Sequence, residues 1–310
     1  MENVVAEVRE IGEGVRIASS AVVKAPKVII GRNVVIDERV KIICKHEIVL
    51  GDNVYIGNDC AIILKSFSIG EYTKLHNHSL LNGKGSVHIG DNCWIGQNCV
   101  LNGEDILTIG NNVGIGTYSS VWTHGYYGQL VEGCQIFSIK PTTIEDDAWL
   151  VGSYNTIFPG VTIGSKAVLM GTSVVTKSLE SNRVYSGNPA RDITDKVGVP
   201  FVPINYSEKR AIILKFLRDS FTDNNKSYSE IENGLDVHGV GRILFDTYDI
   251  ADSKTEAVVF QEEVTDWSLV ENISKFCLTS KMYQKNYTEI ERLVKTILNP
   301  AAARFVTHKS

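Results

Sequence analysis

The feature that most constrains this chain is a six-residue repeat that runs through its first two thirds. Each copy begins with an aliphatic residue, usually followed by Gly, then two polar residues, a small or apolar residue and one more. The clearest copies begin at Ile11, Ile30, Leu50, Ile69, Ile89, Ile109, Ile144 and Ile163. Successive starts are 19, 20, 19, 20, 20, 35 and 19 residues apart, which fits a coil of three six-residue sides plus one or two extra residues.

This period predicts a solenoid, because a repeat of about twenty residues cannot bury its apolar face without its neighbours. Amphipathic helices are excluded, since apolar residues do not recur at helical spacing and Gly is too frequent. A flat parallel sheet is excluded as well, since no crossover helix fits between the strands. We therefore expect a triangular parallel β-helix of eight coils, which at about 4.8 Å per coil is roughly 40 Å tall.

Positions within the hexad predict the interior and the corners. The first residue and the small fifth residue should point inward; the fifth residues are Ala21, Val34, Val54, Cys60, Ser79, Cys93, Cys99, Ser119, Ala148, Ala167 and Ser173. Gly and Asn near the corners are expected to take the positive φ that sharp turns need. These corner residues are Gly31, Asn33, Asn53, Gly90, Asn92 and Asn112.

Composition narrows the class of protein. The chain has 310 residues, 43% of them hydrophobic, and a net charge of −5, which is typical of a soluble globular protein and gives no indication of nucleic-acid binding. We see no leader segment, and no apolar run approaches the roughly 18 residues of a membrane span, so a cytoplasmic protein is expected. Cys60, Cys93 and Cys99 are interpreted as small core residues rather than disulfides or metal ligands.

One side of one coil is much longer than the rest. Irregular lengths fall on the third side of each coil, and there residues 121–143 form a long excursion that must project as a loop. Projecting loops on rigid scaffolds commonly carry function. At its start stands Thr123-His124-Gly125, and His is the usual general base at neutral pH. His124 is our candidate base, against the alternative of an ordinary loop histidine.

The segment from Pro141 to Ile193 carries four motifs. They are Trp149-Leu150-Val151-Gly152-Ser153, Pro159-Gly160-Val161-Thr162-Ile163-Gly164, Ser173-Val174-Val175-Thr176-Lys177 and Gly187-Asn188-Pro189-Ala190-Arg191. Together they resemble the signature of the galactoside, maltose and xenobiotic O-acetyltransferases, which are hexapeptide-repeat acyltransferases with a left-handed parallel β-helix. The resemblance covers about residues 10–195. It implies a mainly β protein, with a left-handed β-helix domain at 1–197 followed by a small α/β domain at 198–310.

The resemblance also implies roles for individual residues. His124 matches the catalytic base, Ser153 the small residue near the thioester, and Asn98 an Asn that binds the sugar acceptor or, equally, an exposed corner residue. The groove for coenzyme A is matched by Trp149, Gly152, Ser153, Thr172, Lys177, Pro189 and Arg191. Two departures stand out: Leu150 is one residue more than the family places before Gly-Ser, and Asn155 replaces a small apolar residue. A bulge there would alter the groove.

Stacking of the coils suggests a partner for the base. Leu81, Leu101 and Val121 begin the third side on successive coils, so Lys84, Glu104 and His124 should lie one above another. Our hypothesis is that Glu104 orients the imidazole and stabilises its protonated form. The alternative is a solvated corner charge.

His76 and His78 alternate on one strand and could suggest a metal pair. The spacing lacks the separated three-His set of the zinc-containing hexapeptide hydratases, so we interpret both as structural or surface residues and expect no metal requirement.

The resemblance implies transfer of an acetyl group from acetyl-CoA to a hydroxyl or amino group of a sugar in a polysaccharide or nucleotide-sugar precursor. No Ser or Cys nucleophile motif is present, so the acceptor should attack the thioester directly. A homotrimer with sites between adjacent chains is implied too. The alternatives are a longer acyl group, an acyl carrier protein as donor, and a non-catalytic trimeric scaffold.

The last third of the chain has no hexads. We expect a helix over 207–220 with Ser207 as N-cap, strands at 242–248 and 256–261, and a helix over 287–298. This small α/β domain could widen the acceptor site, bind a carrier or partner protein, or cap the prism.

Overall fold

The computed structural model describes residues 3–126, 128–246 and 255–308. The chain divides into two compact units, a solenoid unit of residues 1–202 and a C-terminal unit of residues 203–310. The division falls five residues after the boundary expected at 197.

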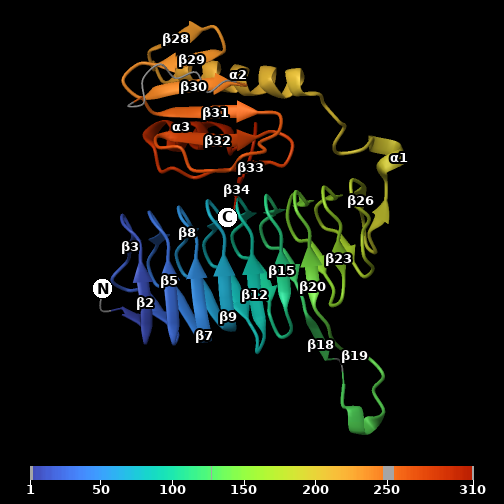
Figure 1. Ribbon diagram of the computed structural model, residues 1–310. Helices are drawn as coiled ribbons and strands as arrows, with labels where there is room; N and C mark the ends of the chain where they lie inside the picture. The colour runs from blue at the N-terminus through green and yellow to red at the C-terminus, as the bar shows by residue number, and fades with distance from the viewer. Residues whose placement is uncertain (1–2, 127, 247–254, 309–310) are drawn as a thin grey trace. The chain divides into compact units, whose positions relative to one another are not determined.

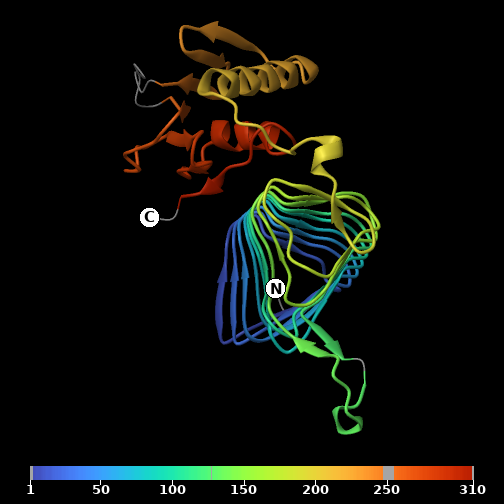
Figure 2. The same cartoon turned by 90° about the vertical axis from the view of Figure 1, so that its right-hand side faces the viewer.

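Three strands per turn, joined by three corners, build the solenoid unit, and Figure 2 looks along the stacked turns. One side forms a ten-stranded sheet of β3 (Arg16–Ile17), β6 (Val35–Ile36), β8 (Tyr55–Ile56), β10 (Lys74–Leu75), β13 (Trp94–Ile95), β16 (Gly114–Ile115), β21 (Trp149–Leu150), β24 (Val168–Leu169), β26 (Val184–Ser186) and β27 (Arg191–Asp192). Pairs between successive turns are parallel and in register, for example Trp94 with Gly114 and Gly114 with Trp149. This confirms the parallel β-solenoid that the repeat predicts.

The other two sides share a bent sheet of fifteen strands. Its members are β1 (Val4–Val5), β2 (Val8–Ile11), β4 (Val22–Lys24), β5 (Lys27–Ile30), β7 (Lys41–Leu50), β9 (Ala61–Ile69), β11 (Leu80–Asn82), β12 (Ser86–Ile89), β14 (Val100–Asn102), β15 (Leu107–Ile109), β17 (Ser120–Val121), β20 (Thr142–Ile144), β22 (Thr156–Ile157), β23 (Thr162–Ile163) and β25 (Val174–Val175). The long strands β7 and β9 run through the corner between the two sides, and their register shifts between Cys44 and Glu47.

The number of turns is larger than predicted. Within the described residues, nine parallel strands of the ten-stranded sheet follow one another from β3 to β26, where eight coils were expected. The additional turn begins at Leu179, which bridges to Ile163 and accepts a hydrogen bond from the backbone N–H of Gly164. It was missed because Glu180 follows Leu179 where the clear repeats have Gly.

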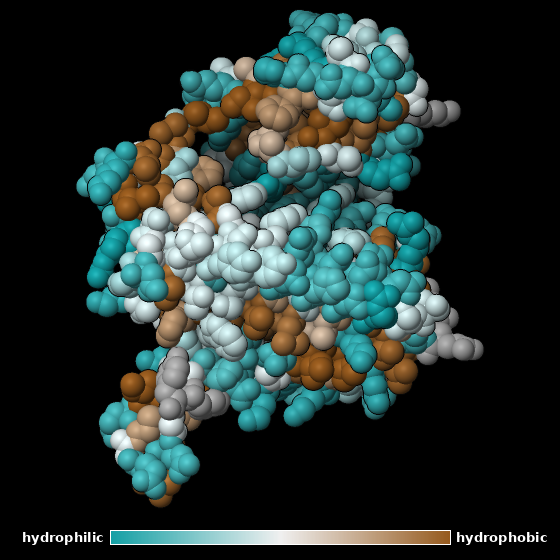
Figure 3. Space-filling model, turned by 180° about the vertical axis from the view of Figure 1, so that it is seen from behind, coloured by the Kyte–Doolittle hydropathy of each residue, from teal (hydrophilic) through white to brown (hydrophobic). Residues whose placement is uncertain are grey.

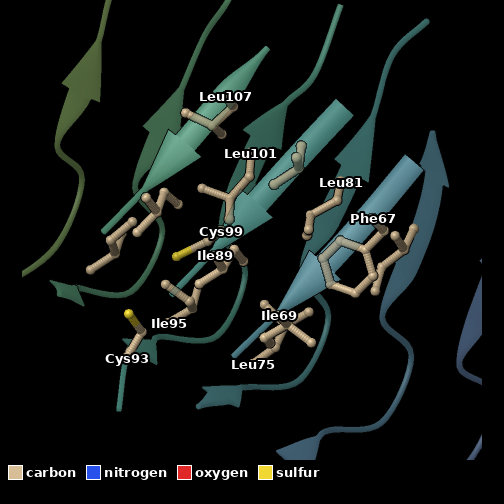
Figure 4. Close-up of a cluster of buried hydrophobic side chains, with 14 of the residues drawn as sticks. Phe67, Ile69, Leu75, Leu81, Ile89, Cys93, Ile95, Cys99, Leu101 and Leu107 are labelled. Carbon is tan, nitrogen blue, oxygen red and sulfur yellow. The ribbon is translucent and has the colours of Figure 1, made fainter. Parts of the chain in front are cut away.

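The interior follows the predicted positions. All eleven small fifth residues are buried, and so are seven of the eight aliphatic first residues; Ile11, in the first of these hexads, is half-buried. Figure 4 shows part of this column, with Ile69, Ile89 and Leu101 among the labelled side chains. Burying one such side chain contributes about 1.5–3 kcal/mol, so the stacked column supplies the main stabilising term of the solenoid unit.

The cysteines at fifth positions are core residues, as predicted. All six cysteines are free. Cys60, Cys93 and Cys99 are at most 2% exposed, and each Sγ donates to a backbone carbonyl one turn away, at 3.2, 3.0 and 3.3 Å respectively. Burial raises the pKa of Cys93 to about 12 and of Cys60 and Cys99 to about 11.

Asn and Gly serve the corners for different reasons. Asn33, Asn53, Asn92 and Asn112 have φ between 54° and 60°, as expected. Gly31 and Gly90 do not have positive φ, so that part of the prediction is wrong. At Gly31 a Cβ atom would lie 2.7 Å from the backbone nitrogen of Asp52, so the glycine is needed for the close approach of two turns.

A short helix, α1 (Thr194–Val197), follows the last turn. The C-terminal unit then begins with α2 (Tyr206–Asp223), whose N-cap is Asn205 in a capping box with Glu208. The predicted cap at Ser207 is therefore wrong; Ser and Asn are both good caps, and the backbone places Asn205 at the boundary.

A seven-stranded mixed sheet forms the rest of the C-terminal unit together with α3 (Glu289–Leu298), which is capped by Thr288. Its strands are β28 (Tyr228–Ile231), β29 (Gly234–Val237), β30 (Gly241–Phe245), β31 (Ala257–Gln261), β32 (Ile273–Cys277), β33 (Met282–Tyr283) and β34 (Val306–Thr307), in that order. Phe245, Phe260 and Phe276 form its core with apolar side chains from both helices. Residues 247 and 248 of the predicted strand lie outside the described residues. Among the described helices, none is both long and apolar enough to cross a bilayer.

Candidate active site

The long excursion leaves the solenoid as an arm (Figure 1). It consists of β18 (His124–Tyr126), a 3-10 turn (Leu130–Glu132) and β19 (Phe137–Ile139), and the two strands pair antiparallel. The arm is anchored where it leaves and returns, since the backbone N–H of Lys140 donates to the carbonyl of Thr123 at 3.0 Å. His124 is its first residue, so a rigid scaffold fixes the backbone of the candidate base.

The imidazole of His124 is half-buried at this corner, which we name the third corner. Its Nδ1 lies 2.7 Å from Oδ1 of Asn102, at the end of β14 on the preceding turn. The indole of Trp122 meets the ring edge-on, with centroids 5.8 Å apart. The ring is therefore held by one polar and one aromatic contact.

The sequence analysis did not identify Asn102. This side chain is 3% exposed, and its Oδ1 also accepts from Thr123 Oγ1 at 2.8 Å and from the backbone N–H groups of Thr123 and Glu104 at 3.3 Å each. The stacking of Leu101 on Val121 was the signal that could have located it, since it places Asn102 one turn below the residues before His124.

Glu104 lies on the same turn as Asn102, but its carboxylate faces Lys84. Its Oε1 is 3.1 Å from the Lys84 ammonium, and its Oε2 accepts from the Lys84 backbone N–H at 3.3 Å. The hydrogen bond at Nδ1 that we expected from Glu104 is thus supplied by Asn102.

Other candidate residues gather at what we name the second corner, where Asn98, Tyr118, Tyr154 and Thr172 have φ between 57° and 63°. Ser153 precedes Tyr154, and its Oγ lies 2.7 Å from Thr117 Oγ1. The backbone N–H of Thr172 donates to the carbonyl of Ser153 at 2.8 Å. Asn98, Gly152, Ser153 and Thr172 are therefore brought together by stacking.

The departures from the family motif are absorbed at this corner. Leu150 is 1% exposed and stays in register between Ile115 and Leu169, so the strand is not bulged there. Asn155 is fully buried, with Oδ1 accepting from the Ser173 backbone N–H at 3.1 Å and Nδ2 donating to the Val151 carbonyl at 3.3 Å. The amide thus ties the longer corner to the core.

Trp149 lies on β21, on the ten-stranded side, with its ring over Gly114 of the preceding turn. A Cβ at position 114 would be 2.5 Å from Cε3 of Trp149, so only glycine leaves room for the indole. Arg191 and Pro189 are exposed beyond the last turn, where the Ala190 N–H bonds the Val174 carbonyl at 2.8 Å. Lys177 is exposed shortly after β25.

The candidate residues of one chain therefore form two groups. His124 and Lys177 lie toward the third corner, while Asn98, Gly152, Ser153 and Thr172 lie at the second corner. Six residues of extended chain separate Tyr118 from His124 on one turn, which is about 20 Å at 3.3 Å per residue. The base and the residues matched to the thioester end of the donor are not adjacent within one chain.

His76 and His78 do not share a site with other metal-binding side chains. His76 packs between Tyr55 and Trp94, with ring centroids 5.8 and 5.2 Å away, and burial lowers its pKa. His78 Nδ1 lies 3.7 Å from Asp59. Across residues 3–126, 128–246 and 255–308, no group of three or more His, Cys, Asp and Glu could hold a metal ion.

Comparisons with known proteins agree with the motifs. No protein-family model matches the chain. It is 36% identical over 112 residues to the galactoside O-acetyltransferase of Escherichia coli K12, a match that covers 36% of this chain and 54% of that protein. It is 28% identical over 168 residues to the putative colanic acid biosynthesis acetyltransferase WcaF of the same organism, covering 54% and 69%. The chain thus spans about half the length of the galactoside enzyme.

A solved structure, that of the polySia specific acetyltransferase NeuO, is 20% identical and gives a TM-score of 0.47 over 66% of this chain and 85% of that one. The sequence matches confirm the resemblance that the motifs predict. The chain is a relative of the hexapeptide-repeat acetyltransferases, with the galactoside O-acetyltransferase among its relatives.

Proposed function

We propose that this protein transfers an acetyl group from acetyl-CoA to a hydroxyl or amino group of a sugar, with His124 as general base. The observation that carries the proposal is the contact between His124 Nδ1 and Asn102 Oδ1 at 2.7 Å, at the root of the arm. With Nδ1 engaged, Nε2 is the nitrogen that can take a proton. The acetyltransferase relatives support the reaction class.

In the proposed reaction Nε2 accepts the proton of the acceptor hydroxyl or amine as that oxygen or nitrogen attacks the thioester carbon. Backbone N–H groups around Gly152 and Ser153 hold the negative oxygen of the tetrahedral intermediate. The carbon–sulfur bond then breaks, and the departing thiolate takes the proton from the imidazolium. The products are the acetylated sugar and coenzyme A thiol, with no acyl-enzyme.

The separation of the two groups supports a site shared between chains. Because about 20 Å of extended chain separates His124 from the second corner, we propose that the second corner of a neighbouring copy faces His124 in a homotrimer. The arm supplies apolar surface for such a contact (brown at lower left in Figure 3), with Leu130, Val131, Ile136, Phe137 and Ile139 exposed.

The experiment that tests the function measures thiol release from acetyl-CoA in the presence of methyl galactoside, maltose or glucosamine. We expect release that depends on one of these acceptors, and a fall in kcat of about 10²–10⁴-fold in His124→Ala. His46→Ala, which removes an exposed histidine of β7, is the matched control and should retain wild-type activity. Undiminished release in His124→Ala would overturn the proposal.

A further inference from the structure

We infer that Asn102 is the positioning residue of this site: it holds His124 in the tautomer that carries the proton on Nδ1, which leaves Nε2 as the basic nitrogen. The inference rests on the proposed role of His124. It adds a second residue, on a different turn of the solenoid, that acts on the reaction only through the imidazole.

The orientation of the Asn102 amide follows from its other partners. Its Oδ1 faces the backbone N–H groups of Thr123 and Glu104, which can only donate. Its Nδ2 donates at 3.0 Å to the backbone carbonyl of Asn82, which can only accept. These one-way partners exclude the flipped amide, so the atom that faces His124 is the oxygen.

This orientation decides the tautomer of the imidazole. The amide oxygen accepts and cannot donate, so the His124 nitrogen at 2.7 Å must carry a proton. In the neutral ring the lone pair then lies on Nε2. If Nδ1 lost this partner, the ring could exchange tautomers, and a molecule with the proton on Nε2 could not accept one from the substrate.

Burial keeps Asn102 in place. The residue is 3% exposed and Thr123 is fully buried, and leaving the donors around Oδ1 without an acceptor would be costly in such surroundings. Asn82 occupies the same register position one turn earlier, yet its side chain is exposed. The buried amide thus belongs to the turn that underlies His124, and Asn82 is a matched control.

The partner is an uncharged amide, which distinguishes this arrangement from a His–carboxylate pair. A carboxylate at position 102 would attract the protonated imidazole and keep His124 charged to higher pH. The charged residues on the segments next to His124 are Lys84, Glu104, Asp105 and Lys140. They are common to the wild type and the Asn102→Asp variant, so a difference between the two reports on residue 102 alone.

The first test reads the tautomer directly and needs no substrate. In protein labelled with ¹⁵N-histidine, the ring signals of His124 are identified by their loss in His124→Gln. We expect the Nδ1–H tautomer in the wild type and in Asn82→Ala, and a mixture or the Nε2–H tautomer in Asn102→Ala. An unchanged tautomer in folded Asn102→Ala would overturn the inference.

The second test uses thiol release from acetyl-CoA with methyl galactoside as acceptor. For Asn102→Ala we expect kcat to fall about 10–100-fold, the range found when a residue that orients a functional imidazole is lost, with both KM values within about twofold. Asn102→Asp keeps the acceptor oxygen, so it should regain activity at high pH, with the acidic limb of its pH profile about one unit above that of the wild type. Asn82→Ala should be unaffected.

The outcomes separate the two proposals. A wild-type rate in His124→Ala removes the proposed base whatever the tautomer is. Loss of activity in His124→Ala together with wild-type kcat, pH profile and tautomer in Asn102→Ala keeps the base and removes the positioning role. If Asn102→Ala does not fold, Asn102→Asp decides: an unshifted acidic limb would contradict the inference.

Discussion

At the scale of the residue, one hexad position serves different needs according to its depth. The inward fifth position accepts Ala, Ser, Val, Cys and, on one turn, Asn155, because the space between stacked turns is small and its polar atoms find backbone partners. A buried thiol at such a position is a packing element, since burial disfavours the thiolate that would react.

Thiol reactivity tests this assignment. Because burial raises the pKa of Cys60, Cys93 and Cys99 to about 11 or 12, hardly any thiolate forms at these sites at pH 8. We expect a thiol reagent at pH 8 to label the half-buried Cys134 of the arm first and the three core thiols only after unfolding. Mass spectrometry of the labelled peptides measures the order, and rapid labelling of Cys93 in the native protein would contradict it.

At the scale of the element, the sequence predicts what repeats and misses what depends on a single local choice. The solenoid follows from the spacing of aliphatic residues and Gly, since that period leaves no other way to bury them. The ninth turn at Leu179 was missed because Glu180 breaks the pattern. The partner of His124 was misassigned because register places both Glu104 and Asn102 below it, whereas side-chain direction decides which of them reaches the ring.

The start of α2 is a local choice of the same kind. Asn205 accepts from the Glu208 backbone N–H at 3.0 Å, and Glu208 returns a bond to the Asn205 N–H at 2.8 Å. Asn205→Ala should therefore lower the free energy of unfolding of the C-terminal unit by about 1 kcal/mol.

Urea unfolding, followed through the C-terminal unit, checks this expectation. Ser207→Ala is the matched control: Ser207 lies in the first turn of α2, so its removal should have little effect. A larger loss for Ser207→Ala than for Asn205→Ala would contradict the observed boundary.

At the scale of the whole molecule, the question is whether one chain can complete the site. His124 and Ser153 lie toward opposite ends of one side of the solenoid, so the proposed homotrimer predicts that base and groove come from different chains. Two defective variants should then complement each other: His124→Ala, and Arg191→Glu assayed at acetyl-CoA well below its KM.

Co-expression of the two variants, purified through separate tags, provides the measurement. If assembly is random and the groove of one chain faces the base of its neighbour, about a quarter of the sites combine an intact base with an intact groove. Thiol release should recover to about that fraction of the wild-type rate. Activity no higher than that of the separate variants would place base and groove in one chain and contradict the shared site.

The central claim is that the imidazole of His124 takes the acceptor's proton. The most direct test is the kcat for coenzyme A thiol release in His124→Ala, measured beside the dissociation constant for acetyl-CoA. We predict that kcat falls at least about 100-fold while acetyl-CoA binds as it does to the wild type. A kcat within about twofold of wild type, with the protein folded and binding its donor, would contradict the account.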